Sequence, residues 1–148
     1  MEYNIEKINE IGKMLVEVIE EAVPQTGAER VRIGDVEMAL RESLRAIGQS
    51  AMKQFLENAD GEVETEIECA CGGKLQYQRR RAATIWSVFG KVVYKRAYYA
   101  GCVCQKGLAP VDHHYGIEAG KVTAGLAHLI ALSGLKESLD EGRKWLKE

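Results

Sequence analysis

Apolar and polar residues alternate with a helical period at the start of the chain. Apolar residues recur at steps of three and four, which predicts an amphipathic helix over about residues 4–23. Pro24 ends this helix, and Asp35 can cap a second amphipathic helix over about residues 35–58. A short connection between two such helices favours an antiparallel hairpin, so we expect residues 1–60 to form a helical hairpin.

The period changes from helical to β-like in the middle of the chain. Residues 61–68 are rich in glutamate and predict an acidic linker or an edge strand. Residues 69–111 then predict a three-stranded β-domain, in which Gly90-Lys91 suits a two-residue hairpin turn. The runs with strand character are Lys74–Arg81, Ala83–Val88 and Lys91–Tyr99.

A helical period returns in the last part of the chain, residues 112–148. It begins after Gly120 and is interrupted at Ser133-Gly134, which predicts a pair of helices in which His128 is partly buried. Such a pair can be a helix-turn-helix or an ordinary helical hairpin. The three regions together predict an α+β fold class.

Charge is distributed unevenly along the chain, although the net charge is only −2. Residues 1–68 contain seven basic and sixteen acidic residues, whereas residues 69–148 contain thirteen and six. Residues 69–111 contain eight basic residues and no acidic one. This segment is therefore expected to meet a polyanion, and a solvated basic face is the alternative.

Targeting and membrane signals are not evident. No apolar run approaches the ~20 residues that a membrane-spanning helix needs. The acidic, periodic N-terminus does not resemble a signal peptide, so we expect a cytoplasmic protein that does not enter membranes.

Four cysteines stand in two Cys-x-Cys pairs that flank the predicted hairpin. Cys69 and Cys71 precede it, Cys102 and Cys104 follow it, and thirty residues separate the pairs. In a reducing compartment such pairs are typical of a tetrahedral zinc site, and four thiolate ligands leave no open position for catalysis. We therefore predict a structural zinc ribbon over residues 69–111. An iron–sulfur cluster and a dithiol redox pair are alternatives.

Histidines and basic side chains are further candidates for function. His113 and His114 could replace a cysteine ligand, but they lie outside the symmetric pattern. Basic residues on the hairpin interleave with Trp86, Tyr94 and Tyr98, of which we expect at least two to form the core of the sheet. The basic residues expected to contact DNA phosphates are Arg79, Arg80, Arg81, Lys91, Lys95 and Arg96.

The order of motifs from about residue 67 onward resembles the N-terminal part of ISKra-type insertion-sequence transposases. The motifs are Cys69-Ala70-Cys71-Gly72-Gly73, Ser87–Val92, Arg96–Tyr99, the second cysteine pair, Gly107, Pro110-Val111-Asp112 and Tyr115-Gly116-Ile117. That family more often has Cys-x-x-Cys, whereas both pairs here have one intervening residue.

The resemblance implies binding of double-stranded DNA at transposon ends, with a DDE-type catalytic domain further along the chain. The present chain would be truncated before that domain and would not itself be an enzyme. Two other functions remain open on the residues alone. One is a protein–protein module, with the helical hairpin as a site of homo-oligomerisation, and the other is a cysteine-based redox protein.

Overall fold

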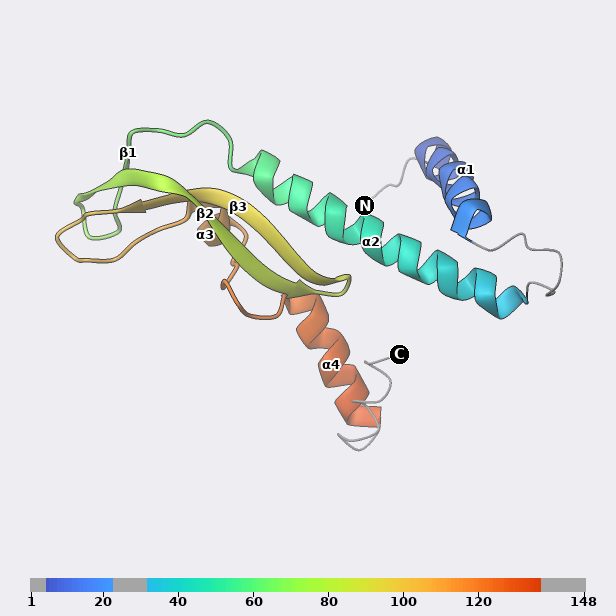
Figure 1. The fold of residues 1–148 in the computed structure, drawn as a ribbon. Coiled ribbons are helices and arrows are strands. Elements are labelled where there is room, and N and C mark those ends of the chain that lie inside the picture. The colour runs from blue at the N-terminus through green and yellow to red at the C-terminus, as the bar shows by residue number, and fades with distance from the viewer. Residues whose placement is uncertain (1–4, 23–31, 137–148) are drawn as a thin grey trace. The chain divides into compact units, whose positions relative to one another are not determined.

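The computed structural model describes residues 5–22 and 32–136 and confirms the α+β class (Figure 1). The chain divides into two compact units, residues 1–48 and 49–148. The boundary lies within one continuous helix, so the second unit begins with the C-terminal part of that helix.

The first unit is helical, as its period predicts. It contains α1 (Ile5–Ala22) and the beginning of α2 (Ile33–Ala59). The backbone N–H of Arg32 donates to the Asp35 carboxylate at 3.1 Å, so α2 starts two residues earlier than expected. Asp35 caps the helix from inside its first turn and not from the position before it. The loop between the helices lies outside the described residues, and the antiparallel pairing of the two helices stays a prediction.

A three-stranded antiparallel sheet in the order β1-β2-β3 forms the centre of the second unit. Its strands are β1 (Glu66–Glu68), β2 (Lys74–Ser87) and β3 (Gly90–Ala100). The acidic segment therefore contributes an edge strand, in which Glu66 forms an ion pair with Lys74. The two runs expected as separate strands before the turn are one long strand.

The turn of the β2–β3 hairpin lies at Val88-Phe89, two residues before the expected Gly90-Lys91. Ser87 accounts for the difference. Its hydroxyl accepts from the Phe89 N–H at 3.1 Å and donates to the Gly90 carbonyl at 3.0 Å, which closes the turn. Gly90 follows with φ 96°, a value that glycine adopts readily.

One extra residue in β2 divides the hairpin into two halves. Tyr77 pairs with Tyr99 and Arg79 pairs with Tyr98, so Gln78 is a bulge. Cross-strand partners share a face, and neighbours along a strand alternate. The bulge therefore inverts the face on which the odd-numbered residues of β2 lie.

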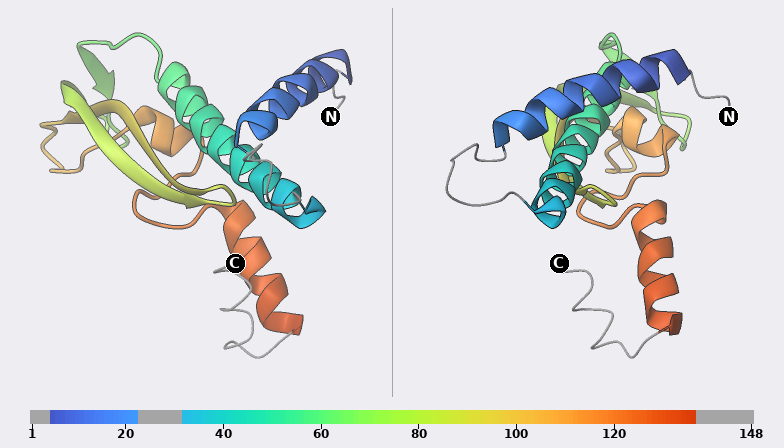
Figure 2. Two further views of the ribbon diagram at one scale, coloured as in Figure 1. Left: turned by 45° about the vertical axis from the view of Figure 1, so that its right-hand side comes forward. Right: turned by 90° about the vertical axis from the view of Figure 1, so that its right-hand side faces the viewer.

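Two apolar clusters lie on opposite faces of the hairpin as a result. The helix-side cluster joins the sheet to the end of α2 and to α3 (Pro110–His114). Figures 1 and 2 show the ribbons of these elements beside the sheet. It contains Leu56, Ala83, Ile85, Val92, Tyr94 and Val111, with Met52 and Ile117 packed against it. The cysteine-side cluster contains Leu75, Ala97, Tyr99 and Cys102, with Ile67, Cys69, Tyr77, Cys104 and Leu108 packed against it.

The last described element is α4 (Ala124–Lys136), which contacts β2. It continues through Ser133 and Gly134, so the break expected there is wrong. The Ser133 hydroxyl donates to the Leu129 carbonyl at 2.9 Å, a bond that accommodates serine inside a helix. His128 is exposed, contrary to expectation. The second helix of the expected pair lies outside the described residues.

Across the described ranges, we find no helix with the length and apolarity that crossing a bilayer demands.

Candidate metal centre and basic surface

Two similar turns bring the four cysteines together. Cys69 and Cys71 follow β1, and Cys102 and Cys104 follow β3. The Gly72 N–H donates to the Cys69 carbonyl and the Gln105 N–H donates to the Cys102 carbonyl, both at 2.9 Å. The fourth residue of each turn has a positive φ, 82° at Gly72 and 57° at Gln105. Each turn thus directs two sulfurs, two residues apart, to the same point.

The sulfur positions fit a tetrahedral metal site. All four Sγ atoms lie within 4.8 Å of one another. The Cys69–Cys104 and Cys71–Cys102 Sγ pairs are 3.5 and 3.2 Å apart, well beyond the ~2.05 Å of a disulfide. Zinc–sulfur bonds of ~2.3 Å in a tetrahedron separate the sulfurs by about 3.8 Å. The cluster can therefore hold a metal ion and is compatible with zinc.

Backbone N–H groups favour the thiolate form that zinc requires. The Cys102 thiol and the Gly73 N–H both donate to the Cys71 sulfur, which lowers the pKa of Cys71 to about 6. The Cys104 N–H favours the thiolate of Cys102, but the neighbouring Cys71 sulfur and burial raise the pKa of Cys102 to about 12. The four thiols thus share protons unequally, and a divalent cation would replace those protons on all four sulfurs.

Two glycines lie where a side chain would not fit, Gly73 against the cysteine sulfurs and Gly107 against Tyr98. A Cβ at Gly73 would lie 2.7 Å from the Cys102 sulfur and 3.5 Å from the Cys71 sulfur. A Cβ at Gly107 would lie 1.9 Å from the Tyr98 hydroxyl. Glycine at position 73 therefore lets the backbone pass close to the sulfur cluster.

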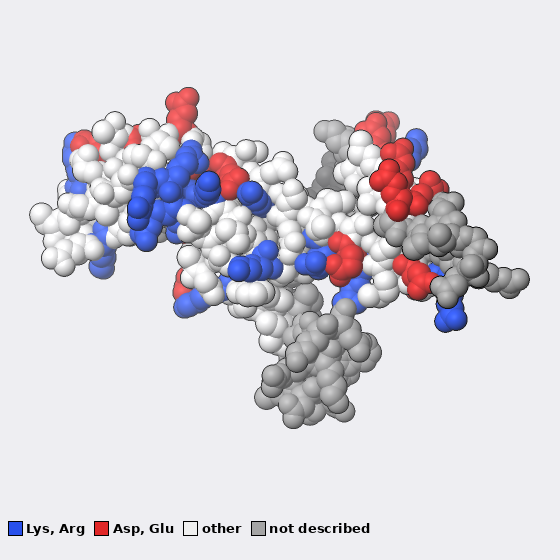
Figure 3. Space-filling model, in the orientation of Figure 1, with Lys and Arg blue, Asp and Glu red and all other residues white. Residues whose placement is uncertain are grey.

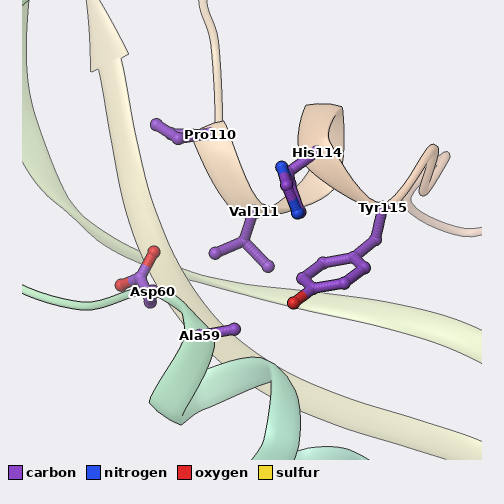
Figure 4. A pocket seen from close by; sticks show the side chains of 6 residues that line it. All are labelled: Ala59, Asp60, Pro110, Val111, His114 and Tyr115. Atoms are coloured by element: carbon purple, nitrogen blue, oxygen red, sulfur yellow. The ribbon is translucent and has the colours of Figure 1, made fainter.

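The histidines lie elsewhere. His113 and His114 are exposed on α3, and neither belongs to the cysteine cluster. Figure 4 shows His114 beside a shallow pocket between α3 and the end of α2. The Asp60 carboxylate also lines this pocket, but both of its oxygens accept from the Ala97 N–H at 2.9 Å. The Asp60 carboxylate is therefore already hydrogen-bonded within the protein.

The six basic residues predicted to contact DNA do not share one surface. Cross-strand pairing places Arg79, Arg81 and Arg96 on the face of the helix-side cluster, and Arg80, Lys91 and Lys95 on the opposite face. Figure 3 shows basic side chains gathered over the sheet and few acidic ones there. Within the described part of the chain, no ion pair involves Arg79, Arg81, Lys91 or Lys95. These four are exposed and available to an anion.

Two of these six basic residues, both arginines, have structural partners. Arg80 lies 2.7 Å from Asp60, whose side chain is only 1 % exposed. Arg96 is 8 % exposed and its Nε lies 2.9 Å from the Asp112 carboxylate. The inclusion of Arg96 in the DNA-contacting set is therefore wrong, because its guanidinium is committed inside the molecule.

A buried polar network around Asp112 was not anticipated. Asp112 accepts from the Tyr94 hydroxyl at 2.5 Å and from Arg96, which also donates to the Arg81 carbonyl at 3.1 Å. Arg96 follows Tyr94 and Val92 in the alternation of β3, a signal that it points to the core. Of the three aromatic residues considered for the core, Tyr94 is fully buried, Tyr98 is half-buried and Trp86 is exposed.

Comparison with known proteins adds no further assignment: no family model, curated protein or solved structure matches the chain.

Proposed function

We propose that the second unit is a DNA-binding module stabilised by a structural zinc ion. We further propose that the chain belongs to the DNA-binding N-terminal region of an insertion-sequence transposase. The observation that carries DNA binding is the exposure of Arg79, Arg81, Lys91 and Lys95, which form no ion pair with any described residue. They lie on a hairpin whose ends meet at the cysteine cluster. The family assignment rests on the motif resemblance alone.

Zinc would cross-link the two turns and hold the ends of β2 and β3 in register. Each pair of cysteines belongs to a different turn, so the ion would close a loop of about thirty residues. Four thiolates with one zinc ion leave a local charge of about −2, which the basic residues of the hairpin exceed. Thiolate ligands persist in a reducing compartment, which supports a cytoplasmic location.

The number of basic residues on each face limits the salt dependence of DNA binding. A duplex meets one face of the sheet at a time, and each face offers two or three exposed cations. Counterion release changes log affinity by about −0.9 per phosphate contact for each unit of log salt. A slope of about −2 to −3 is therefore expected.

The test is a titration of fluorescent duplex DNA at several salt concentrations. The double variant Arg79→Ala/Arg81→Ala should flatten the slope by up to about 1.8 units if this face binds the duplex. Arg41→Ala/Lys53→Ala is the matched control, because it removes two exposed cations from α2. Arg80 is left intact, since its loss would remove the ion pair of buried Asp60. Undetectable binding at about 50 mM salt would refute DNA binding.

Exposed apolar residues on α1 favour a second role, self-association of the chain. Ile8, Ile11 and Met14 are at least half exposed although they belong to the apolar stripe of the helix. We propose that a second copy of α1 covers them, since apolar stripes on helices pair readily. Sedimentation should show an oligomer that Ile8→Glu/Ile11→Glu converts to a monomer and Asn9→Glu does not. A monomeric parent protein would refute this role.

A further inference from the structure

One face of the hairpin combines exposed cations with an exposed indole. Lys91 pairs with Trp86, Val93 with Thr84, and Lys95 with Ala82. These six residues, here termed the Trp86 face, lie on the opposite side from the helix-side cluster. Trp86 is 46 % exposed and Val93 is 47 % exposed. The neighbours of Trp86 on this face of β2, Ala82 and Thr84, have small side chains that do not cover the indole.

The edges of the hairpin beside this face are already occupied. On the β3 side, the Lys95 N–H donates to the carboxylate of Glu57 in α2, and the Ala97 N–H donates to the carboxylate of Asp60 just after α2, both at 2.9 Å. On the β2 side, Trp86 exchanges backbone hydrogen bonds with Lys121 and Thr123 at 3.0 and 2.8 Å. A partner peptide therefore cannot add a strand at these positions, and the hairpin cannot enter a DNA groove edge first. The flat face is what remains accessible.

We propose that the Trp86 face binds an unpaired nucleic-acid strand. A base would stack on Trp86 beside Val93, while Lys91 and Lys95 neutralise phosphates on either side. The two lysines are four residues apart on β3, roughly 13 Å, so they flank the apolar pair. The face itself carries two cations and no acidic residue, which complements a polyanion.

Stacking on Trp86 requires a base whose face is free. In a duplex both faces of each base are covered by its neighbours, so an exposed tryptophan on a flat sheet gains contact only with unpaired bases. The inference rests on the proposed DNA-binding function and names the form of nucleic acid that this face selects. Arg79 and Arg81, on the other face, would remain free for duplex phosphates.

Tryptophan fluorescence reports this contact directly. The chain has two tryptophans, and the substitution Trp145→Phe leaves Trp86 as the sole tryptophan, which can be excited selectively over the tyrosines. Titration of this full-length, zinc-loaded variant with an oligothymidylate should quench the emission of Trp86, and a duplex of equal charge should quench it far less. Equal quenching by both, or no quenching by the single strand while the strand binds, overturns the proposal.

Three variants separate stacking from charge. Trp86→Ala should weaken single-strand binding about 5- to 100-fold with little change in salt slope. Lys91→Ala/Lys95→Ala should reduce that slope by about 1.4 units, because single strands lose about 0.7 per contact. Lys106→Ala, an exposed lysine outside the face, is the matched control for loss of charge.

The outcomes also separate this proposal from the more general one. Duplex binding that depends on Arg79 and Arg81, with single-strand binding indifferent to Trp86, would refute the Trp86 face and leave the DNA-binding function standing. No binding to either form would refute both. Equal binding of a poly-glutamate peptide would show that only unspecific charge is recognised, which also overturns a stacking site.

Discussion

The substitution Asp112→Asn gives a direct test of the buried polar network. It keeps the size of the side chain and removes the negative charge that faces Arg96. The side chains of Arg96 and Asp112 are only 10 % and 13 % exposed, so water cannot replace the lost counter-ion effectively. The Tyr94 hydroxyl also donates to Asp112, so the same change disturbs a second buried group.

The expected loss of stability is large. Removing one partner of a buried ion pair generally costs about 3–5 kcal/mol, since the other charge remains buried. For a domain of about 100 residues each kcal/mol lowers the melting temperature by about 4–8 °C. Asp112→Asn should therefore lower the melting temperature of the zinc-loaded protein by roughly 12 °C or more, as measured by circular dichroism or calorimetry.

A triple variant separates an unbalanced charge from a general packing defect. Tyr94→Phe/Arg96→Met/Asp112→Leu removes all three polar groups together and leaves no buried charge. Replacement of a whole buried network by apolar residues is often nearly neutral, so the triple variant should be more stable than Asp112→Asn alone. If Asp112→Asn costs less than about 1 kcal/mol, or if the triple variant is the less stable of the two, the network does not act as described.

Four further predictions concern the metal centre and the pH dependence. Gly73→Ala should weaken zinc binding at least tenfold in a competition assay with a chromogenic chelator, because the added Cβ would lie 2.7 Å from the Cys102 sulfur. Gly72→Ala is the control: no atom lies within 4 Å of its added Cβ, so it should lower the free energy of unfolding only by the roughly 1–2 kcal/mol that a positive φ costs alanine. Gln105→Gly should stabilise the holo protein by up to about 1 kcal/mol in a urea titration, since φ is 57° there. Removal of zinc by a chelator should abolish hydrogen-exchange protection at the amides of Leu75 and Tyr99 and leave the protection of Ile85 and Val92 unchanged. Rapid alkylation of two cysteines in the presence of zinc would instead favour the redox alternative. Burial and the hydrogen bond to Asp112 raise the pKa of Tyr94 above its ordinary value of 10. The stability that neutral Tyr94 contributes is therefore intact below pH 10 and is lost as the pH rises beyond it. Tyr94→Phe should flatten this alkaline loss of stability in thermal melts between pH 9 and about 11.

The helices and the cysteine site were predictable because their signals are local. A stripe of apolar residues at helical spacing specifies α1 and α2 without knowledge of any partner. The chain has only two Cys-x-Cys pairs and no further cysteine, so a tetrahedral site with four thiolate ligands must use all four. The geometry of the turns adds detail to this prediction but does not change it.

The faces of the hairpin were not predictable because they depend on a single unpaired residue. The sequence shows alternation in β3, but it gives no sign that Gln78 is skipped in the pairing of β2. In a regular strand Tyr77 and Arg79 would share a face. Without knowledge of the bulge, the sequence therefore cannot assign the three consecutive arginines to one face or the other. Exposure of Trp86 follows from the same register, since Trp86 pairs with Lys91 and not with a core residue of β3.

Arg96 shows why a charge pattern alone misplaces a residue. An arginine among tyrosines on a basic hairpin is as compatible with a phosphate contact as with a buried ion pair. The deciding fact is the position of Asp112, which follows β3 by twelve residues and reaches the core only because α3 packs against that strand. A single acidic residue immediately after a segment with none was the one available signal, and its partner could not be chosen among eight basic residues.

The bulge also determines how far the metal can influence the rest of the molecule. The cysteine-side cluster packs directly on Cys69, Cys102 and Cys104, so its order would depend on an ion bound by those sulfurs. The helix-side cluster lies on the opposite face beyond Gln78 and contains no cysteine. Its stability comes instead from α2, α3 and the Asp112 network, none of which requires zinc. Since Lys91, Lys95 and Trp86 lie in that second half of the hairpin, the Trp86 face should keep its shape when the metal is lost. Arg79 directly follows the bulge, so of the four exposed cations it should be the one whose contribution to DNA affinity depends most on zinc.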